Sequence, residues 1–399
     1  MDIADSRQSW IRLATSLLIG TIGSVGFWSF VVALPAVQAE FGASRADASL
    51  PYTLTMVGFA FGGVGMGWLV DRYGLLPPLL IGAVCIGVGY VAAGLAPNLW
   101  IFALVQGCLI GVGTSVFFGP ILADISHWFE KRRGLAVTIC SSGNYVAGAI
   151  WPPVLQHFID SEGWRATHVG VGVFCLLTML PLAFLLRRRS PVAMLSGPMQ
   201  NSASDGLGIP PAVLTTLLAI AGFACCVAMS MPQVHLVAYC ADLGYGPARG
   251  AEMLSLMLGL GIVSRIASGL LADRIGGMTT LLIGSGAQSV ALFLYLWFDG
   301  LASLFVISAI VGLFQGGIIP MYTLIVREYF PAQKAGSTLG VIMMTTLIGM
   351  AAGGWMSGLV FDHTGSYRMA FLNGLLWNLL NLAIVVFLMT RPRLTPAMA

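Results

Sequence analysis

Long apolar segments follow one another along the chain, separated by short polar stretches. A helix needs about 20 mainly apolar residues to cross the hydrocarbon core of a bilayer. Segments of this kind cover residues 12–35, 49–70, 76–95, 99–125, 134–158, 167–186, 211–239, 250–272, 279–298, 302–326, 335–360 and 369–390. They are too long for the strands of a membrane barrel, and they do not alternate strictly. The pattern therefore predicts an all-α membrane protein with twelve transmembrane helices.

The composition favours lipid as the solvent around these helices. Of the 399 residues, 57% are hydrophobic and only 9% are charged, whereas soluble domains carry about a quarter charged residues. The net charge of +3 gives no argument for nucleic acid as a partner. The seven cysteines show no metal-ligand spacing, and their odd number argues against a disulfide framework. We expect a lipid-embedded protein with neither a metal site nor a cofactor.

The basic residues predict the orientation of the chain in the membrane. With the N-terminus in the cytoplasm, the cytoplasmic segments hold fourteen of the 19 Lys and Arg residues. The opposite side holds Arg45, Arg165, Arg249 and Arg368, and Arg265 falls inside a helix. The positive-inside rule requires an asymmetry of this kind. We expect a multi-pass protein of the inner (plasma) membrane with both termini in the cytoplasm.

The longest hydrophilic stretch lies between the sixth and seventh apolar segments, from Arg187 to Gly208. It is rich in Ser, Pro and Gly, a composition typical of a linker. The expected domains are an N-terminal six-helix bundle at 1–186, a cytoplasmic linker at 187–210 and a C-terminal six-helix bundle at 211–399.

Short landmarks recur in the two predicted bundles at nearly one offset. Asp71-Arg72-Tyr73-Gly74 ends the second segment, and Asp273-Arg274-Ile275-Gly276 ends the eighth, 202 residues later. Trp128-Phe129 and Tyr329-Phe330 end the fourth and tenth segments at an offset of 201, and Trp164-Arg165 and Tyr367-Arg368 open the sixth and twelfth at an offset of 203. Because six is an even number, the second copy enters the membrane in the same direction as the first. The sequence therefore predicts two parallel six-helix repeats.

The first landmark carries a family resemblance. Both copies resemble the helix 2–3 motif of the major facilitator superfamily, as Gly67-Trp-Leu-Val-Asp71-Arg72-Tyr-Gly74 and Gly269-Leu-Leu-Ala-Asp273-Arg274-Ile-Gly276. The resemblance implies the major facilitator fold. It also implies a cytoplasmic gate made by Asp71, Arg72, Asp273 and Arg274, in which Arg72 pairs with an acid near the end of the fourth helix, Asp124.

A longer segment, Trp128 to Gly143, reads Trp-Phe-Glu-Lys-Arg-Arg-Gly-Leu-Ala-Val-Thr-Ile-Cys-Ser-Ser-Gly. It resembles a signature of the monocarboxylate transporters and the bacterial oxalate/formate antiporters, and Gly163-Trp164-Arg165 fits the same group. The resemblance implies a carrier of small organic anions.

Arg265 lies eight residues before Asp273, or roughly 12 Å into the bilayer at 1.5 Å per residue. A guanidinium there costs on the order of 3 kcal/mol and usually faces a polar cavity. The residues one turn away on the same helix are Gly261 and Gly269, so an anionic substrate can complete the site. The resemblance also implies that Arg265 is the substrate arginine. A structural arginine bound to backbone carbonyls or to a distant acid is the alternative.

Other residues are candidates for the substrate path. The oxalate antiporters place a lysine in helix 11, but residues 336–361 of this chain hold no Lys or Arg, which favours a monocarboxylate over a dicarboxylate. His235 is a candidate proton relay or substrate contact, and a polar residue at the outer mouth is the alternative. Further candidates to line the central cavity, with plain packing as the alternative for each, are Phe117, Phe118, Tyr322, Trp28, Asn144 and Trp355.

The leading hypothesis is a secondary active transporter of a small monocarboxylate such as lactate or pyruvate, working by alternating access as a monomer with the proton as coupling ion. An exporter of a hydrophobic drug or metabolite and an organic anion exchanger are the alternatives within transport. An intramembrane enzyme or sensor is disfavoured, because the five histidines are scattered and no catalytic motif is present. We therefore expect no catalytic residues.

Overall fold

Helices joined by short turns make up the computed structural model, which describes residues 5–129, 132–188, 209–330 and 332–391. No β-strand occurs in these ranges. The helices before the predicted linker are α1 (Arg7–Gly23), α2 (Val25–Phe41), α3 (Arg45–Tyr73), α4 (Leu76–Gly94), α5 (Leu99–Val105), the π-helix η1 (Gln106–Gly111), α6 (Val112–Ser115), α7 (Gly119–Ser126), α8 (Arg133–Ser141) and α9 (Gly143–Leu185). Those after it are α10 (Pro211–Asp242), α11 (Pro247–Ile275), α12 (Gly277–Trp297), α13 (Leu301–Gln315), α14 (Ile318–Tyr329), α15 (Ala332–Thr364) and α16 (Tyr367–Met389).

The described residues contain 11 helical segments that are long and apolar enough to cross a membrane. The longest, Gly134–Leu185, has 52 residues and includes Gly163, whose φ of 81° and ψ of 159° are not helical. This segment therefore holds two of the predicted spans, 134–158 and 167–186. With that division, the structure confirms the prediction of an all-α membrane protein built from twelve apolar segments.

The chain divides into two compact units. Unit 1 comprises Met1–Ser196 with Val234–Gly259, and unit 2 comprises Gly197–Gln233 with Leu260–Ala399. The division cuts α10 and α11, so the end of α10 and the beginning of α11 belong to unit 1. The repeat-based domain boundaries at 186 and 211 stay a prediction beside it.

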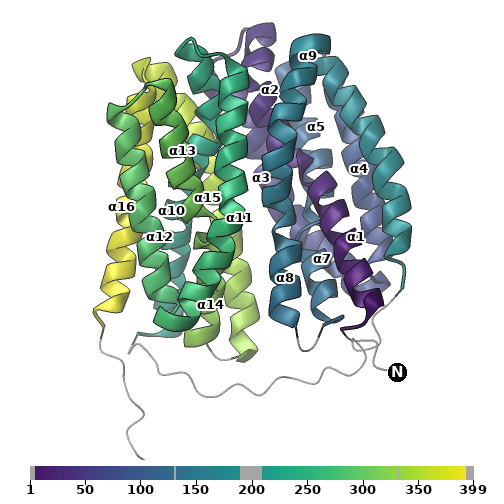
Figure 1. The fold of residues 1–399 in the computed structure, drawn as a ribbon, viewed down its shortest axis with the longest axis vertical. Coiled ribbons are helices and arrows are strands. Elements are labelled where there is room, and N and C mark those ends of the chain that lie inside the picture. The colour runs from purple at the N-terminus through teal and green to yellow at the C-terminus, as the bar shows by residue number, and fades with distance from the viewer. Residues whose placement is uncertain (1–4, 130–131, 189–208, 331, 392–399) are drawn as a thin grey trace, which may run out of the picture. The chain divides into compact units, whose positions relative to one another are not determined.

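Each unit has a core of helices packed side by side (Figure 1). In unit 1, α4 packs along α9, and α3 packs along η1. In unit 2, α12 packs along α16 and α13. The unit 2 core includes Leu218 of α10, Leu281 of α12 and Ile325 of α14, each fully buried.

Glycines with positive φ mark the repeat in the backbone. Gly74 has a φ of 83° at the end of α3, and Gly276 has a φ of 84° at the end of α11, 202 residues later. Gly163 and Gly365 are the next such pair, at φ of 81° and 65°. Residues that have a side chain rarely adopt a positive φ, so both repeats need glycine where these helices end or bend.

A second shared feature is an interruption in the fourth and tenth apolar segments. In the fourth, a turn at residues 116–118 separates α6 from α7, and Phe118 has a non-helical φ of −117° and ψ of −84°. In the tenth, a turn at Gly316 and Gly317 separates α13 from α14. Backbone groups freed at such interruptions are tolerated in a membrane only where protein or a polar cavity satisfies them.

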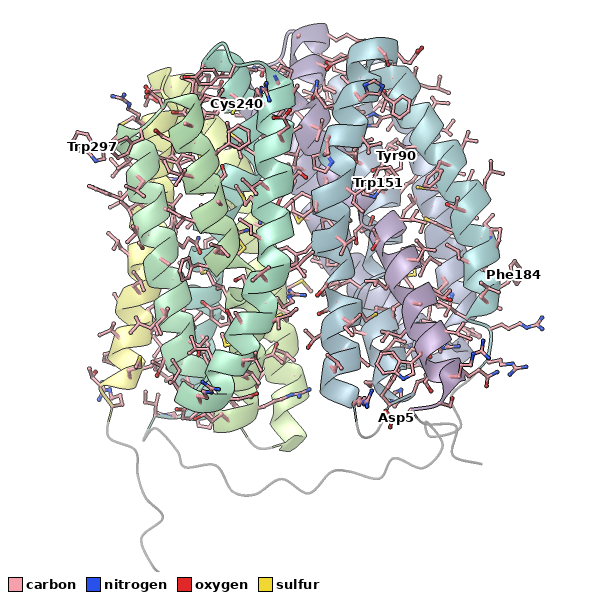
Figure 2. All side chains as sticks on the ribbon, in the orientation of Figure 1. Asp5, Tyr90, Trp151, Phe184, Cys240 and Trp297 are labelled. Carbon is pink, nitrogen blue, oxygen red and sulfur yellow. The ribbon has the colours of Figure 1, made fainter. Side chains whose placement is uncertain are left out.

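Large apolar side chains are exposed on the described helices, among them Leu177 (71%) and Trp297 (67%). Figure 2 shows Phe184 and Trp297 pointing away from the helices that carry them. A water-facing surface is not built this way, whereas a lipid-facing surface is. The protein is therefore a multi-pass membrane protein.

Candidate functional site

Arg265 lies on α11, and its side chain is partly exposed. Its Nε donates a hydrogen bond to the backbone carbonyl of Gly316 at 3.4 Å. Gly316 directly follows the last residue of α13, at the interruption of the tenth apolar segment. The arginine predicted from the sequence to bind substrate therefore meets an opened stretch of backbone inside unit 2.

Small residues bring α11 and this interruption into close contact. The backbone N–H of Gly317 donates to Oγ of Ser264 at 3.2 Å, and Ser264 is almost fully buried. A Cβ atom at Gly316 would collide with the backbone carbonyl of Gly261, and one at Gly317 would collide with Ser268. Glycines at both positions let the backbones approach this closely. We call this group the Arg265 junction: Gly261, Ser264, Arg265, Gly316 and Gly317.

The beginning of α14 adds a second positive feature at the Arg265 junction. Gly317 is the N-cap residue of α14, a helix of 12 residues that begins at Ile318. The aligned peptide dipoles give the N-terminus of a helix a partial charge of about +0.5. Interrupted helices in transporters commonly place such N-termini toward anionic substrate groups. The guanidinium of Arg265 and the start of α14 both favour one negative charge.

Gln315 was not among the candidates from the sequence, and it is the last residue of α13. Its side chain is 2% exposed. Within the described part of the chain, neither Oε1 nor Nε2 of this amide has a hydrogen-bond partner. The signal available in the sequence was an amide within an otherwise apolar segment, next to two glycines.

Two of the predicted substrate residues meet in unit 1. Trp28 of α2 is 4% exposed, and its Nε1 donates to the backbone carbonyl of Asn144 in α9 at 3.2 Å. The side-chain Oδ1 of Asn144 is buried, with no hydrogen-bond partner among the described residues. The structure thus brings Trp28 and Asn144 together.

Phe117 and Phe118 occupy the interruption of the fourth apolar segment, and the structure separates their environments. Phe117 is buried and its ring packs against Gly23, where an added Cβ would lie 2.7 Å away. Phe118 is partly exposed, and its ring centroid is 6.3 Å from that of Phe59, which in turn lies 4.8 Å from Phe27. Phe117 therefore packs within unit 1. Phe118 lies at the end of a row of three aromatic rings, and part of its side chain is exposed.

Tyr322 is fully buried in the core of unit 2. Its hydroxyl donates to Oδ1 of Asn381 in α16 at 3.0 Å. The amide of Asn381 donates in turn to Oγ of Ser285 at 2.9 Å. This network joins α14, α16 and α12, so the structure gives Tyr322 a role in packing, and its role as a substrate contact stays a prediction.

The remaining two substrate candidates differ in exposure. His235 in α10 is completely buried. Trp355 in α15 is 37% exposed. The relay role of His235 and the cavity role of Trp355 stay predictions.

The four gate residues of the repeated motif lie at the ends of two helices. Asp71 and Arg72 are exposed near the end of α3, and Asp273 and Arg274 are exposed near the end of α11. The guanidinium carbon of Arg72 lies 5.5 Å from the ring centroid of Trp68.

Asp124 in α7 forms its ion pair with Arg12 of α1, and not with Arg72, the partner that the resemblance implied. Arg12 is buried and lies over the ring of Trp128 at 4.6 Å. Arg12 lies in the second turn of α1, which begins at Arg7. Its buried side chain contacts the end of the fourth apolar segment through Asp124.

Another ion pair in unit 1 borders a cavity. Nη2 of Arg45 donates to Oδ2 of Asp242 at 2.8 Å. Arg45 is 6% exposed. The cavity has a volume of about 330 Å³ and is lined by Pro35, Gln38, Ala39, Gly42, Ala43, Arg45 and Asp242. None of the predicted substrate residues lines it, so it is separate from the Arg265 junction.

Known proteins with similar sequences are transporters. Rat (Rattus norvegicus) Monocarboxylate transporter 13 is 26% identical over 367 residues, covering 90% of this chain and 82% of the relative. The agnestins efflux protein AgnL12 of Paecilomyces divaricatus is 27% identical over 370 residues, covering 91% and 83%. The names of these relatives include both a carboxylate carrier and an efflux protein.

A solved structure has the same fold. A bacterial homologue of the human lysosomal transporter Spinster, in an inward-facing and occupied conformation, superimposes with a TM-score of 0.77 at 16% identity, covering 99% of this chain and all of that one. The family model of the Major Facilitator Superfamily matches residues 16–311 and 299–397. Almost the whole chain is covered, and the protein therefore belongs to the Major Facilitator Superfamily of transporters.

Proposed function

We propose that this transporter carries a small organic monocarboxylate such as lactate or pyruvate across the inner membrane by alternating access. The observation that carries the proposal is the position of Arg265 on α11, against the interruption between α13 and α14. Two relatives of the chain are monocarboxylate transporters by name, from rat and from Bos taurus.

The chemistry of the Arg265 junction suits one carboxylate. A guanidinium has five N–H donors in a planar fork and binds a carboxylate through two parallel hydrogen bonds. With five donors, Arg265 can keep its contact with Gly316 while it binds the substrate. The partial positive charge at the start of α14 adds to the attraction. We propose Phe118, Trp28, Asn144, His235, Tyr322 and Trp355 as further contacts along the path, and Phe117 as packing behind it.

Proton coupling is part of the proposal. A carboxylate that crosses with one proton moves without net charge, so an inward proton gradient can drive its uptake. His235 is the candidate proton carrier on the chain, because imidazole exchanges a proton near neutral pH. We also propose that both termini are cytoplasmic, since the positive-inside rule places the basic segments there, and that the chain works as a monomer built from the domains 1–186 and 211–399.

A second function is favoured by a specific comparison. The agnestins efflux protein matches the chain about as well as the monocarboxylate transporters do. An exporter of a larger apolar compound, or an exchanger of organic anions, fits the same fold. These functions differ from the leading proposal in whether Arg265 is required and whether a proton gradient drives transport.

Uptake of labelled lactate and pyruvate into proteoliposomes tests the proposal. Wild type is compared with Arg265→Ala and with Arg249→Ala, a control at an exposed ion pair. We expect uptake that an inward proton gradient stimulates, that Arg265→Ala abolishes and that Arg249→Ala preserves. Folded wild type that takes up neither compound overturns the assignment. Uptake without gradient stimulation but with stimulation by an internal anion points to exchange.

A further inference from the structure

Next to the Arg265 junction lies one polar side chain that the proposed function leaves unused. Gln315 is 2% exposed and ends α13. Neither its carbonyl oxygen nor its amide nitrogen has a hydrogen-bond partner among the described residues. A buried amide that makes no hydrogen bond destabilises the fold, so its presence needs an explanation, and a bound ligand that completes its hydrogen bonds is one.

Gln315 is the chain neighbour of the residue that Arg265 contacts. Gln315 precedes Gly316 in the chain, and consecutive Cα atoms are about 3.8 Å apart. Gly316 is the residue whose carbonyl accepts the hydrogen bond from Nε of Arg265. Gln315 therefore lies beside the carbonyl that Arg265 contacts, at the same interruption of the tenth apolar segment.

Nearby polar groups of the junction and of α13 already have partners. Oγ of Ser264 accepts from the N–H of Gly317. Ser308, two turns before Gln315 on α13, is hydrogen-bonded to the hydroxyl of Tyr295 at 2.9 Å. These side chains have hydrogen-bond partners within the protein, whereas the amide of Gln315 has none among the described residues.

We infer that Gln315 is the specificity residue of the transporter, which hydrogen-bonds the hydroxyl or carbonyl oxygen on the carbon next to the substrate carboxylate. An amide both donates and accepts, so it pairs equally with a 2-hydroxy and a 2-oxo group. The substrate class is then 2-hydroxy and 2-oxo monocarboxylates rather than unsubstituted short-chain acids. The inference rests on the proposed function, because Arg265 must hold the carboxylate.

The backbone around Gln315 permits the small shift that such a contact needs. Gly316 and Gly317 follow it, and a turn separates α13 from α14 at this point. The end of α13 can therefore move relative to α14 without breaking a continuous helix. In the described structure the amide is covered by protein, so substrate contact requires this movement.

Competition binding to the purified full-length protein tests the inference. Labelled lactate is displaced by unlabelled lactate, pyruvate or propionate, which has the same carboxylate but no oxygen on the adjacent carbon. Wild type should prefer lactate and pyruvate over propionate by at least about tenfold, because a site built for a hydroxyl rejects the analogue that lacks it. In Gln315→Leu the three acids should bind within about twofold of one another, with propionate affinity retained.

The matched control is Gln106→Leu. Gln106 is a fully buried amide of unit 1, and its two polar atoms also lack hydrogen-bond partners among the described residues. It should keep the wild-type preference. If Gln315→Leu does not fold, Gln315→Met serves instead, because methionine has nearly the same length and flexibility as glutamine.

The outcomes separate this inference from the proposed function. Binding that is lost in Arg265→Ala while Gln315→Leu keeps the wild-type preference overturns the role of Gln315 alone. Equal binding of lactate and propionate by wild type overturns it as well. Binding of lactate that is unaffected in Arg265→Ala overturns the proposed function, and with it the inference.

Discussion

Arg12 and Asp124 form a two-point ion pair across 112 residues of sequence: Nε of Arg12 donates to Oδ2 of Asp124 at 2.7 Å, and Nη2 donates to Oδ1 at 3.0 Å. Nη2 also donates to the backbone carbonyl of Leu186 at 3.1 Å. The two side chains are 5% and 13% exposed. One guanidinium therefore joins α1, α7 and the end of α9 within unit 1.

Removing one partner of this pair should be strongly destabilising. Arg12→Ala leaves the carboxylate of Asp124 mostly buried and without its bidentate partner, which costs about 3–5 kcal/mol in comparable pairs. Unfolding of the detergent-solubilised protein by denaturant measures the change. The control is Arg249→Ala, which breaks an ion pair whose side chains are 53% and 44% exposed and should cost less than about 1 kcal/mol. Equal losses in the two variants would show that Arg12 contributes no more than a surface charge.

Adding one carbon at Gly316 should disable the Arg265 junction. In Gly316→Ala the new methyl group meets the backbone of Gly261, and backbone cannot move aside as a side chain can. We expect a loss of carboxylate binding together with lower stability. Gly269→Ala on α11 is the control, since an added Cβ there meets no atom within 4 Å. Normal binding by Gly316→Ala would mean that the close contact between α11 and the interruption is not needed.

The ion pair between Arg45 and Asp242 can be tested by exchanging its charges. Arg45→Asp or Asp242→Arg places two like charges where a 2.8 Å pair of opposite charges now lies, so each single variant should lose stability. The double variant restores attraction and should recover part of the loss. A double-mutant cycle on thermal unfolding gives the coupling. A double variant no more stable than the worse single variant would count against a direct interaction in the membrane-embedded protein.

A comparison of variants at Trp28 and Trp151 distinguishes a substrate contact from a packing role. Trp28 and Trp151 each donate an indole N–H to a backbone carbonyl, at 3.2 Å and 3.1 Å. Replacing either with phenylalanine removes one hydrogen bond and should cost about 1 kcal/mol of stability. Because only Trp28 is proposed to contact substrate, Trp28→Phe alone should weaken lactate binding. Similar affinities in the two variants would remove Trp28 from the proposed path.

The apolar pattern and the repeated landmarks were sufficient to predict the helices. A segment that crosses lipid must be long, apolar and internally hydrogen-bonded. The number and approximate length of the membrane-spanning segments can therefore be counted from the apolar stretches of the sequence. The pairing of Gly74 with Gly276 reflects the same repeat, since both end a helix with positive φ. Local sequence therefore predicted well the features that depend on one helix alone, namely where it lies in the chain and where it ends.

Contacts between distant segments were predicted less well. Nothing in the spacing of Arg12 indicated that it pairs with an acid 112 residues later. For Tyr322 the sequence left cavity lining and packing open, because the pattern of a mainly apolar membrane helix does not show which face is buried. Gln315 was not predicted, because the cost of a buried amide becomes visible only when its neighbours are known.

Arg265 is proposed to hold the substrate carboxylate, and equilibrium binding of labelled lactate to purified Arg265→Lys and Arg265→Ala measures this contact. Lysine keeps the charge but not the paired donors, so Arg265→Lys should weaken binding by about tenfold and Arg265→Ala by about a hundredfold or more. Arg249→Ala should bind as wild type does. Lactate binding that is unchanged in folded Arg265→Ala would show that Arg265 does not hold the carboxylate.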